Sequence, residues 1–289
     1  MLIAPTELAA RLEPGNPTRP VVLDATVLLD RPPAGGPYTP VPQREAYDQA
    51  HVPGARFADL VTDLADPAAP FPFAIPSPER FAWRIAALGV GDGTPVVAYA
   101  QGAPMWATRL WWLLTYFGHD DVAVLDGGLP AWRAAGLPLT DAPTPPPSAP
   151  PRFTPRPRPE LLATRADVEA IVAGDAGAAC LVNALPATVF RGDGPSSYSR
   201  PGRIPGSLNV PHATLVDPDT NRFRPRAELS DALAALPADG PVVAYCGGGI
   251  SATVDVFALA LLGRRDDVRL YDGSLTEWTA DPALPVETG

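Results

Sequence analysis

Short runs of apolar residues recur along the chain, and the segments between them carry apolar positions at the spacing of an α-helix. The runs predict strands at residues 21–25, 95–99 and 122–125, and again at 180–184, 241–245 and 268–271. Helices are predicted at residues 78–88 and 105–117 in the first half and at 226–236 and 251–262 in the second. Strands that alternate with helices form parallel sheets covered on both faces, so we expect an α/β fold.

The pattern of the first half is repeated in the second. The string Pro-Val-Val-Ala-Tyr ends at Tyr99 and occurs again ending at Tyr245, 146 residues later. Further pairs keep the same order: Asp126-Gly-Gly-Leu with Asp272-Gly-Ser-Leu and Trp132 with Trp278 at the same offset, and Val52-Pro-Gly with Ile204-Pro-Gly at an offset of 152. Chance reuse of common apolar strings would not keep this order. We therefore expect two homologous domains, each of a size that supports one core.

A proline-rich segment separates the two copies. Residues 141–159 read DAPTPPPSAPPRFTPRPRP. Proline lacks a backbone N–H and fixes its own φ angle, so this density excludes a helix and favours an extended linker. We expect an N-terminal domain at residues 1–140, a linker at 141–159 and a C-terminal domain at 160–289.

The composition narrows the classes of partner. The chain of 289 residues has a net charge of −10 and no lysine, which argues against nucleic acid. It has neither an apolar stretch long enough to cross a bilayer nor the basic start of a signal peptide, so we expect no membrane partner. Its two cysteines, Cys180 and Cys246, make no Cys-x-x-Cys motif, and His51, His119 and His212 lack metal-ligand spacing. We expect a cytoplasmic protein without a metal, with Cys180 as part of the core.

Cys246 is the strongest candidate for chemistry, because it directly follows the second copy of the repeated strand. The first copy has Ala100 there. Three glycines and then Ile250 and Ser251 follow Cys246, just before a predicted helix. Glycines let a short loop curl so that its amides point inward, and the helix N-terminus adds positive potential, so the loop is predicted to hold an anion beside the thiol. Two alternatives are a nucleotide loop and a buried cysteine without chemistry.

Several motifs in a fixed order match those of one protein family. They are Tyr245-Cys-Gly-Gly-Gly-Ile-Ser-Ala252, Tyr271-Asp-Gly-Ser-Leu-Thr-Glu-Trp278 and Arg203-Ile-Pro-Gly-Ser-Leu-Asn-Val-Pro211 in the second half, and His51-Val-Pro-Gly-Ala55, Arg109-Leu-Trp-Trp112 and Leu125-Asp-Gly-Gly-Leu129 in the first. With them, nearly the whole chain resembles a two-domain rhodanese of the thiosulfate/3-mercaptopyruvate sulfurtransferase family. The resemblance implies two tandem rhodanese-like domains, each a central parallel sheet with helices on both faces, of which the first is catalytically silent.

The resemblance also implies a role for each part of the loop. Cys246 would be the nucleophile that carries sulfur as a persulfide. Asp272 and Ser274 would support the loop from the neighbouring strand end. The backbone amides of the loop would cradle the sulfur, and they belong to Gly247, Gly248, Gly249, Ile250 and Ser251. The enzyme would need no cofactor; it would take sulfur from thiosulfate or 3-mercaptopyruvate and give it to cyanide or a thiol.

Two arginines are candidates for holding the anionic donor. The family pattern Arg-Phe/Tyr-x-Gly appears here as Val189-Phe-Arg-Gly192, so Val189 takes the usual arginine position and Arg191 stands two places later. Arg203 precedes the Ile-Pro-Gly motif, where a histidine is usual. The glycine loop is nearer the mercaptopyruvate type, yet Phe73 stands where those enzymes have a histidine. The identity of the donor therefore stays open at this point.

Two other functions remain as alternatives to a sulfurtransferase. The changed arginine and histidine positions leave open a sulfur-carrier module that passes its persulfide only to a protein acceptor. A cysteine phosphatase or arsenate reductase has a similar loop, but it closes that loop with an arginine six positions after the cysteine. This chain has Ala252 there, so the loop fits one sulfur atom better than a phosphate.

Overall fold

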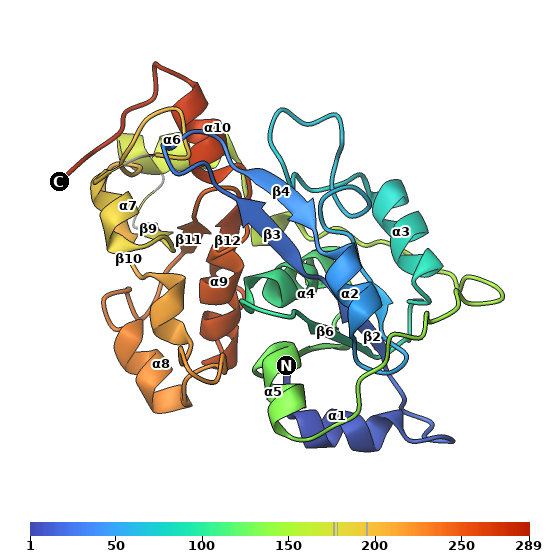
Figure 1. The fold of residues 1–289 in the computed structure, drawn as a ribbon. Helices are drawn as coiled ribbons and strands as arrows, with labels where there is room; N and C mark the ends of the chain where they lie inside the picture. Colours follow the sequence, from blue (N-terminus) through green and yellow to red (C-terminus); the bar gives the residue numbers. More distant parts are fainter. Residues whose placement is uncertain (176, 178, 195) are drawn as a thin grey trace.

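The fold follows the repeat in the sequence, with two α/β halves that lie side by side (Figure 1). The computed structural model describes residues 1–175, 177, 179–194 and 196–289. The first half contains β1 (Leu2–Ile3), α1 (Pro5–Leu12), β2 (Val21–Asp24), β3 (Val27–Asp30), β4 (Thr39–Pro42), α2 (Arg44–Gln49), β5 (Arg56–Phe57), α3 (Pro78–Ala87), β6 (Val96–Tyr99), α4 (Met105–Tyr116), β7 (Val122–Leu125) and α5 (Gly128–Ala134). The second half contains β8 (Leu162–Ala163), α6 (Arg165–Ala173), β9 (Cys180–Asn183), α7 (Ala187–Arg191), β10 (Leu208–Asn209), α8 (Arg226–Ala232), β11 (Val242–Tyr245), α9 (Ala252–Leu261), β12 (Val268–Tyr271) and α10 (Ser274–Ala280), with 3₁₀-helices at Pro159–Leu161 and His212–Leu215.

Each half is built on one parallel sheet. Within the described residues each sheet has five strands, in the order β1-β7-β6-β2-β5 in the first half and β8-β12-β11-β9-β10 in the second. Equivalent strands of the repeat take equivalent places, and every pairing within these two sheets is parallel. The predicted α/β fold with two parallel sheets is confirmed.

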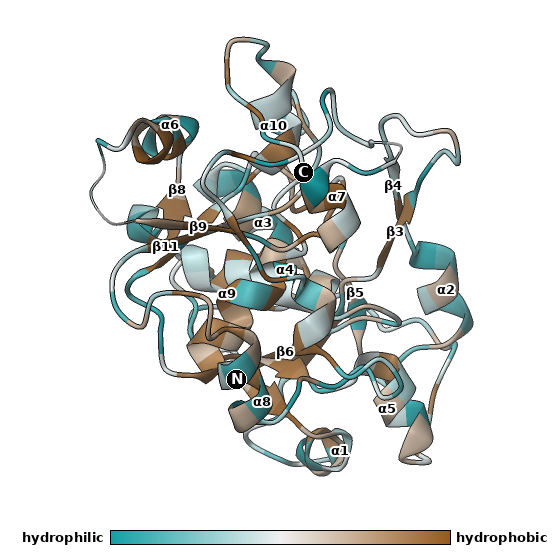
Figure 2. Cartoon of the chain, turned by 90° about the vertical axis from the view of Figure 1, so that its left-hand side faces the viewer, coloured by the Kyte–Doolittle hydropathy of each residue, from teal (hydrophilic) through white to brown (hydrophobic). Residues whose placement is uncertain are grey.

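The predicted strands are all present, within one residue of their expected ends. All four residues of β6 and of β11 are buried, because these central strands are covered on both faces. Figure 2 shows β9 and β11 as hydrophobic, with hydrophilic residues on peripheral helices such as α2. Of the predicted helices, α8 alone ends early, at Ala232, because the next turns use bonds to the third rather than the fourth preceding residue. None of the described helices combines the length and apolar composition that crossing a bilayer requires.

Helices α4 and α9 pack against each other and join the two halves. Residues 106–114 of α4 and 252–260 of α9 are buried, as expected for helices that are apolar around most of their circumference. The rings of Trp111 and Phe257 meet edge to face with 4.8 Å between centroids. Each helix follows the central strand of its own sheet. The contact therefore places the loop after β11, which contains Cys246, near the junction of the halves.

The proline-rich segment is packed along the first half. The described residues from 141 to 158 contain no helix or strand, in keeping with their proline content. The buried ring of Phe153 lies 5.6 Å from that of Phe81, and the amide of Arg156 donates to the carbonyl of Phe117 at 2.9 Å. The segment is thus ordered by contacts with the N-terminal core. The exact domain boundaries at residues 140 and 160 stay a prediction.

A hairpin that the hydrophobic pattern did not predict extends from the first half to the second (Figure 1). Strands β3 and β4 pair antiparallel, and the turn between them spans residues 31–38. The amide of Gly36 in this turn donates to the carbonyl of Ser196 at 2.8 Å. The hairpin therefore brings side chains of the N-terminal half to the C-terminal half, beside the loop that contains Cys246.

Candidate active site

Cys246 lies at the carboxyl end of the central strand of the second half. β11 ends at Tyr245, and α9 begins at Ala252 after a short loop. The residue Cys246 is 1% exposed and lines a cavity of about 450 Å³. Both halves line this cavity, the first through its hairpin and the start of α4. The carboxyl ends of parallel strands are the usual place for ligands in open α/β sheets.

The hydroxyl of Ser274 holds the Cys246 loop in place through hydrogen bonds. Its Oγ accepts hydrogen bonds from the amides of Cys246 at 3.0 Å and Gly249 at 3.2 Å, and it donates to the carbonyl of Tyr271 at 2.8 Å. Ser274 adopts a φ of 51°, an unusual angle for a residue other than glycine, and its side chain is fully buried. Because its N–H is used inside the loop, Gly249 does not offer an amide to a sulfur atom, contrary to the expectation.

Four other amides of the loop remain available. Within the described part of the chain, the backbone N–H groups of Gly247, Gly248, Ile250 and Ser251 make no hydrogen bond. Polar groups in such a confined place are normally satisfied, and orphaned amides next to a helix N-terminus attract an anion. Four of the five expected amides therefore have no partner among the described residues and belong to residues that line the cavity with Cys246.

Each of the three glycines lies against a different side chain. A Cβ atom at Gly247 would overlap the ring and hydroxyl of Tyr198, and one at Gly248 would lie 2.7 Å from the hydroxyl of Tyr38. At Gly249 it would lie 2.6 Å from the carboxylate of Asp272, and the φ of 71° there also favours glycine. The glycine run therefore reflects close approach by two tyrosines and one carboxylate as much as loop flexibility.

The two tyrosines present neutral hydroxyls to the loop. Burial, with a smaller contribution from the nearby Cys246, raises the pKa of Tyr38 to about 12 against the opposing effect of Arg31. Burial likewise raises the pKa of Tyr198, again with a contribution from Cys246. Phenols that stay protonated at neutral pH are hydrogen-bond donors. Tyr38 comes from the hairpin of the first half and Tyr198 from the second, and the motif comparison had assigned a role to neither.

A buried arginine of the first half also holds the Cys246 loop, through a hydrogen bond and an ion pair. Nη1 of Arg109 contacts Oδ1 of Asp272 at 2.6 Å and donates to the carbonyl of Gly249 at 3.1 Å. Nη2 donates to the carbonyl of Phe73 at 2.5 Å, and the amide of Ile75 donates to Oδ2 of Asp272 at 3.1 Å. Both side chains of the ion pair are at most 9% exposed. Asp272 thus lies against the loop, as expected, but a residue of the N-terminal half holds it there.

Neither arginine favoured by the motif comparison lines the cavity. Arg191 is exposed and pairs with Asp193 at 2.8 Å. It lies two residues after Val189 on α7, and positions two apart on a helix face in different directions. Val189 lines the cavity instead. The expectation that Arg191 holds the donor is therefore not supported by the geometry.

Arg203 is held in another network. Its guanidinium lies 4.6 Å from the ring centroid of Phe190, its Nε is 3.3 Å from a carboxylate oxygen of Glu287, and its Nη1 donates to the carbonyl of Gly289 at 2.7 Å. These contacts anchor the last residues of the chain. Arg203 does not line the cavity, so its position likewise gives no support to the expected donor-binding role.

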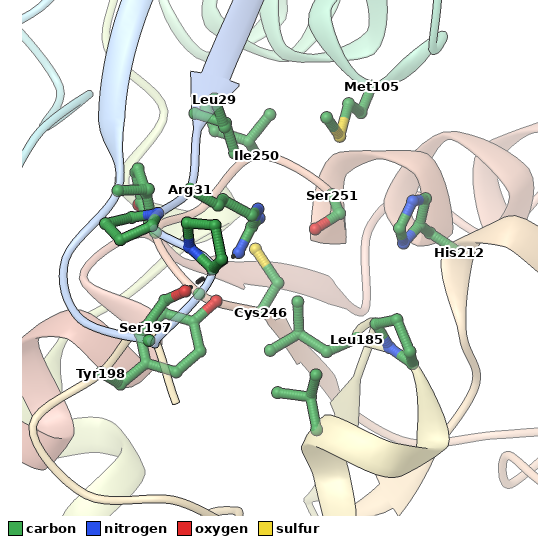
Figure 3. Close-up of a pocket in the computed structure, with 18 residues that line it drawn as sticks. Leu29, Arg31, Met105, Leu185, Ser197, Tyr198, His212, Cys246, Ile250 and Ser251 are labelled. Carbon is green, nitrogen blue, oxygen red and sulfur yellow. Dashed lines mark hydrogen bonds between the residues drawn. The ribbon is translucent and has the colours of Figure 1, made fainter. Parts of the chain in front are cut away.

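The cavity contains a cation that the motifs did not indicate, Arg31 in the turn of the hairpin. Figure 3 shows its guanidinium pointing into the cavity, toward the sulfur of Cys246. The run of prolines and glycines after β3 was a signal for a turn, since residues 31–37 read RPPAGGP. Nothing in that signal indicates that the turn crosses to the other half of the molecule.

His212 lines the cavity on the side opposite Arg31 (Figure 3). Its Nδ1 lies 2.8 Å from the carbonyl oxygen of Ala184. A carbonyl only accepts, so Nδ1 carries the proton and Nε2 has none when the ring is neutral. Burial lowers the pKa of His212, so the ring is neutral at physiological pH. His51, by contrast, bonds the carbonyl of Tyr47 within the first half and is away from this cavity.

The second thiol lies at the other end of the sheet. Cys180 begins β9 and is level with Val242 at the start of β11, whereas Cys246 follows the end of that strand. It is half-buried, and burial raises the pKa of its thiol. Both cysteines are free. Their separation along the sheet leaves Cys246 as the thiol of the cavity.

Comparisons with known proteins identify the family of the chain. The family model for the rhodanese-like domain matches residues 4–135 and 190–281. The curated "Probable 3-mercaptopyruvate sulfurtransferase" of Pseudomonas aeruginosa is 37% identical over 296 residues, covering 100% of this chain and 98% of its own. The "Thiosulfate/3-mercaptopyruvate sulfurtransferase 1, mitochondrial" of Arabidopsis thaliana is 33% identical over 87% of this chain and 72% of its own.

A solved structure extends the likeness to the complete fold. The crystal structure of SseA from Escherichia coli, described as a 3-mercaptopyruvate sulfotransferase, is similar with a TM-score of 0.78 and 29% identity. The match covers 94% of this chain and 98% of that one. Two parallel sheets in the same strand order, two matches of one family model and full-length relatives lead to one conclusion: this chain belongs to the rhodanese family of sulfurtransferases, in its two-domain form.

Proposed function

We propose that this protein transfers sulfur from a small anionic donor to a thiophilic acceptor through a persulfide on Cys246. The observation that carries the proposal is the surroundings of the thiol, which lines a cavity beside four loop amides that have no partner among the described residues. A sulfur atom added to this thiol becomes an anionic persulfide. Amides without a partner in the described structure and the N-terminus of α9 stabilise an anion at that point.

The proposed chemistry is a two-step covalent transfer. The thiolate of Cys246 attacks the transferable sulfur, an S–S bond forms, and the bond from that sulfur to the rest of the donor breaks. The donor leaves with the bonding electrons, as sulfite from thiosulfate or as the enolate of pyruvate, which takes up a proton, from 3-mercaptopyruvate. Cyanide or an acceptor thiolate then attacks the outer sulfur and releases the Cys246 thiolate.

The choice of donors follows the relatives, whose names specify 3-mercaptopyruvate or both this compound and thiosulfate. The cavity of about 450 Å³ is large enough for either compound, and residues of both halves line it. A phosphatase is disfavoured because the loop reaches α9 at Ala252 without an arginine that could close around a phosphate.

The proposal is tested by following one sulfur atom. Incubation with 3-mercaptopyruvate or thiosulfate should add the mass of one sulfur to the peptide that contains Cys246, and cyanide should remove it. Cys246→Ser should abolish both steps, because a hydroxyl cannot carry a persulfide, while circular dichroism shows an intact fold. Cys180→Ser is the matched control and should keep full activity. Added sulfur on the Cys180 peptide, or turnover by Cys246→Ser, would contradict the proposal.

The same experiment distinguishes the proposed enzyme from a carrier module that passes sulfur only to a protein acceptor. Such a protein would gain the sulfur but would not turn over with cyanide or a small thiol. Rapid, repeated release of sulfur to cyanide in the presence of excess donor would favour the enzyme. Loading without small-molecule release would favour the carrier.

A further inference from the structure

The wall of the active-site cavity is mostly apolar at the place where the family pattern has an arginine. Val189 takes the usual arginine position and lines the cavity together with Leu29, Leu185 and Ile250. Among the described residues that line it, Arg31 is the one with a full positive charge. His212 is neutral because burial lowers its pKa. A donor anion that enters this cavity therefore meets one cationic side chain, the polar groups beside Cys246 and a mostly hydrophobic wall.

Arg31 is held in place by an aromatic ring and a hydroxyl group, neither of which neutralises its charge. Its guanidinium lies 5.3 Å from the ring centroid of Tyr38, and Nη1 donates to Oγ of Ser197 at 3.3 Å. Within the described chain it makes no salt bridge, unlike Arg191 and Arg203, which both pair with carboxylates. The free edge of a guanidinium held in this way matches the geometry of a carboxylate.

We infer that Arg31 of the N-terminal hairpin binds the anionic group of the sulfur donor, and that the cavity favours organic monoanions over inorganic thiosulfate. The inference rests on the proposed function of Cys246 and adds the residue that selects its substrate. One guanidinium balances one carboxylate, whose carbon chain then lies on the apolar wall. Thiosulfate carries two charges on a body with no apolar part, so one guanidinium balances half of its charge and the apolar wall gains no contact in return.

The position of Arg31 also gives the first half a direct part in the reaction. Figure 3 shows Arg31 above the sulfur of Cys246, with Ser197 and Tyr198 of the second half beside the turn that carries it. The half without a thiol thus supplies the charge that recognises the donor, and the half with the thiol supplies the nucleophile. The loss of the usual arginine at Val189 is compensated from across the domain junction.

A matched pair of donors isolates the charge. Mercaptoacetone has the same reacting sulfur, carbon and ketone as 3-mercaptopyruvate but carries a methyl group in place of the carboxylate. Arg31→Met should lower the ratio of kcat/KM for 3-mercaptopyruvate to kcat/KM for mercaptoacetone roughly ten- to a hundredfold, as expected for a lost charge-assisted hydrogen bond. Arg31→Lys, which keeps the charge but not the planar fork, should fall between. Arg191→Met, outside the cavity, should leave the ratio unchanged.

A failure of the role of Arg31 can be distinguished from a failure of the proposed sulfur transfer through Cys246. An unchanged ratio in Arg31→Met, or an equal loss with both donors, would overturn the role of Arg31 while Cys246→Ser is still inactive. A parent enzyme with a higher kcat/KM for thiosulfate than for 3-mercaptopyruvate would overturn the selection of organic monoanions. If Cys246→Ser is active, the proposed function fails first and this inference fails with it.

Discussion

At Gly248 the absence of a side chain allows the N-terminal half to approach the Cys246 loop closely. The hydroxyl of Tyr38, from the N-terminal hairpin, would lie 2.7 Å from a Cβ at this position, and the next neighbour, the hydroxyl of Thr276, would lie 3.8 Å away. The space that a glycine leaves is therefore occupied by one atom of the other half. At Gly247 the ring of Tyr198 approaches as well as its hydroxyl, so no single-atom change would make room there.

This difference allows a rescue experiment at Gly248. Gly248→Ala should lower kcat/KM for sulfur transfer roughly ten- to a hundredfold, because the loop or the hairpin must move by a few tenths of an ångström or more. Adding Tyr38→Phe removes the obstructing oxygen and should recover part of that loss. Steady-state kinetics of the four proteins in the cycle measures the coupling. Gly93→Ala, with nothing near its Cβ, is the control, and a double variant as impaired as Gly248→Ala would show that the Tyr38 hydroxyl is not the obstacle.

At the scale of elements, helix α9 follows the Cys246 loop directly and contains a buried carboxyl group. It begins directly after the Cys246 loop, and its residues 252–260 are buried. One of these is Asp255, whose two carboxylate oxygens are buried and have no hydrogen-bond partner among the described residues. Burial raises the pKa of Asp255 well above its ordinary value, and the nearby Cys246 adds to the shift. The surroundings of Asp255 in this helix therefore favour the protonated, neutral form of its carboxyl group.

Asp255 should make stability fall as pH rises. In the unfolded chain an aspartate ionises near pH 4, whereas in the folded protein Asp255 stays protonated to a higher pH. At a pH between the two pKa values of Asp255, the folded state binds more protons than the unfolded state. In that range each rise of one pH unit therefore lowers the free energy of unfolding by up to about 1.4 kcal/mol. Asp255→Asn removes the titration, and its stability relative to the parent should increase from pH 5 to pH 8.

Urea denaturation at the two pH values measures this difference. Asp239→Asn, at an exposed position, serves as the control substitution. Parallel pH profiles for the parent and Asp255→Asn would show that the carboxyl of Asp255 titrates in the folded protein as it does in the unfolded chain, so that α9 does not hold a neutral acid.

At the scale of the whole molecule, the two halves exchange equivalent contacts across their junction. The carboxylate of Asp126 accepts from the amide of Phe223 at 3.0 Å, and that of its counterpart Asp272 accepts from the amide of Ile75 at 3.1 Å. The symmetry ends at Arg109, which bonds Asp272 and the Cys246 loop, while the equivalent position of α9 holds Asp255. The half without a thiol therefore supports the active loop of the other half.

Removing Arg109 should disturb stability and catalysis together. Arg109→Met leaves the carboxylate of Asp272 buried without its partner and should reduce the free energy of unfolding by about 3–5 kcal/mol. It should also lower kcat, because Gly249 and Asp272 lose their common anchor. Adding Asp272→Asn should restore part of the stability.

Chemical denaturation and steady-state kinetics measure both effects. Arg11→Met, which removes an exposed pair with Glu7, is the control and should change stability by less than about 1 kcal/mol. If Arg109→Met is no less stable than Arg11→Met, the ion pair across the junction does not hold the two halves together.

The sequence by itself determined the repeated α/β architecture, the strands and helices of each half, and the location of Cys246 at the end of a central strand. These features depend on local patterns: apolar runs, helical spacing, and a cysteine followed by glycines. The hairpin at residues 27–42 was not predicted, because its prolines and glycines mark a turn without indicating a strand on either side.

Only the tertiary structure decided which residues share the cavity. Arg31 and Tyr38 reach Cys246 because α4 packs on α9 and brings the hairpin over the other half, and no spacing along the chain encodes that packing. Arg191, close to the motif in sequence, is excluded because a two-residue step on α7 turns it to another side. Local chemistry can be read from neighbouring residues, whereas a site between two domains depends on how those domains pack.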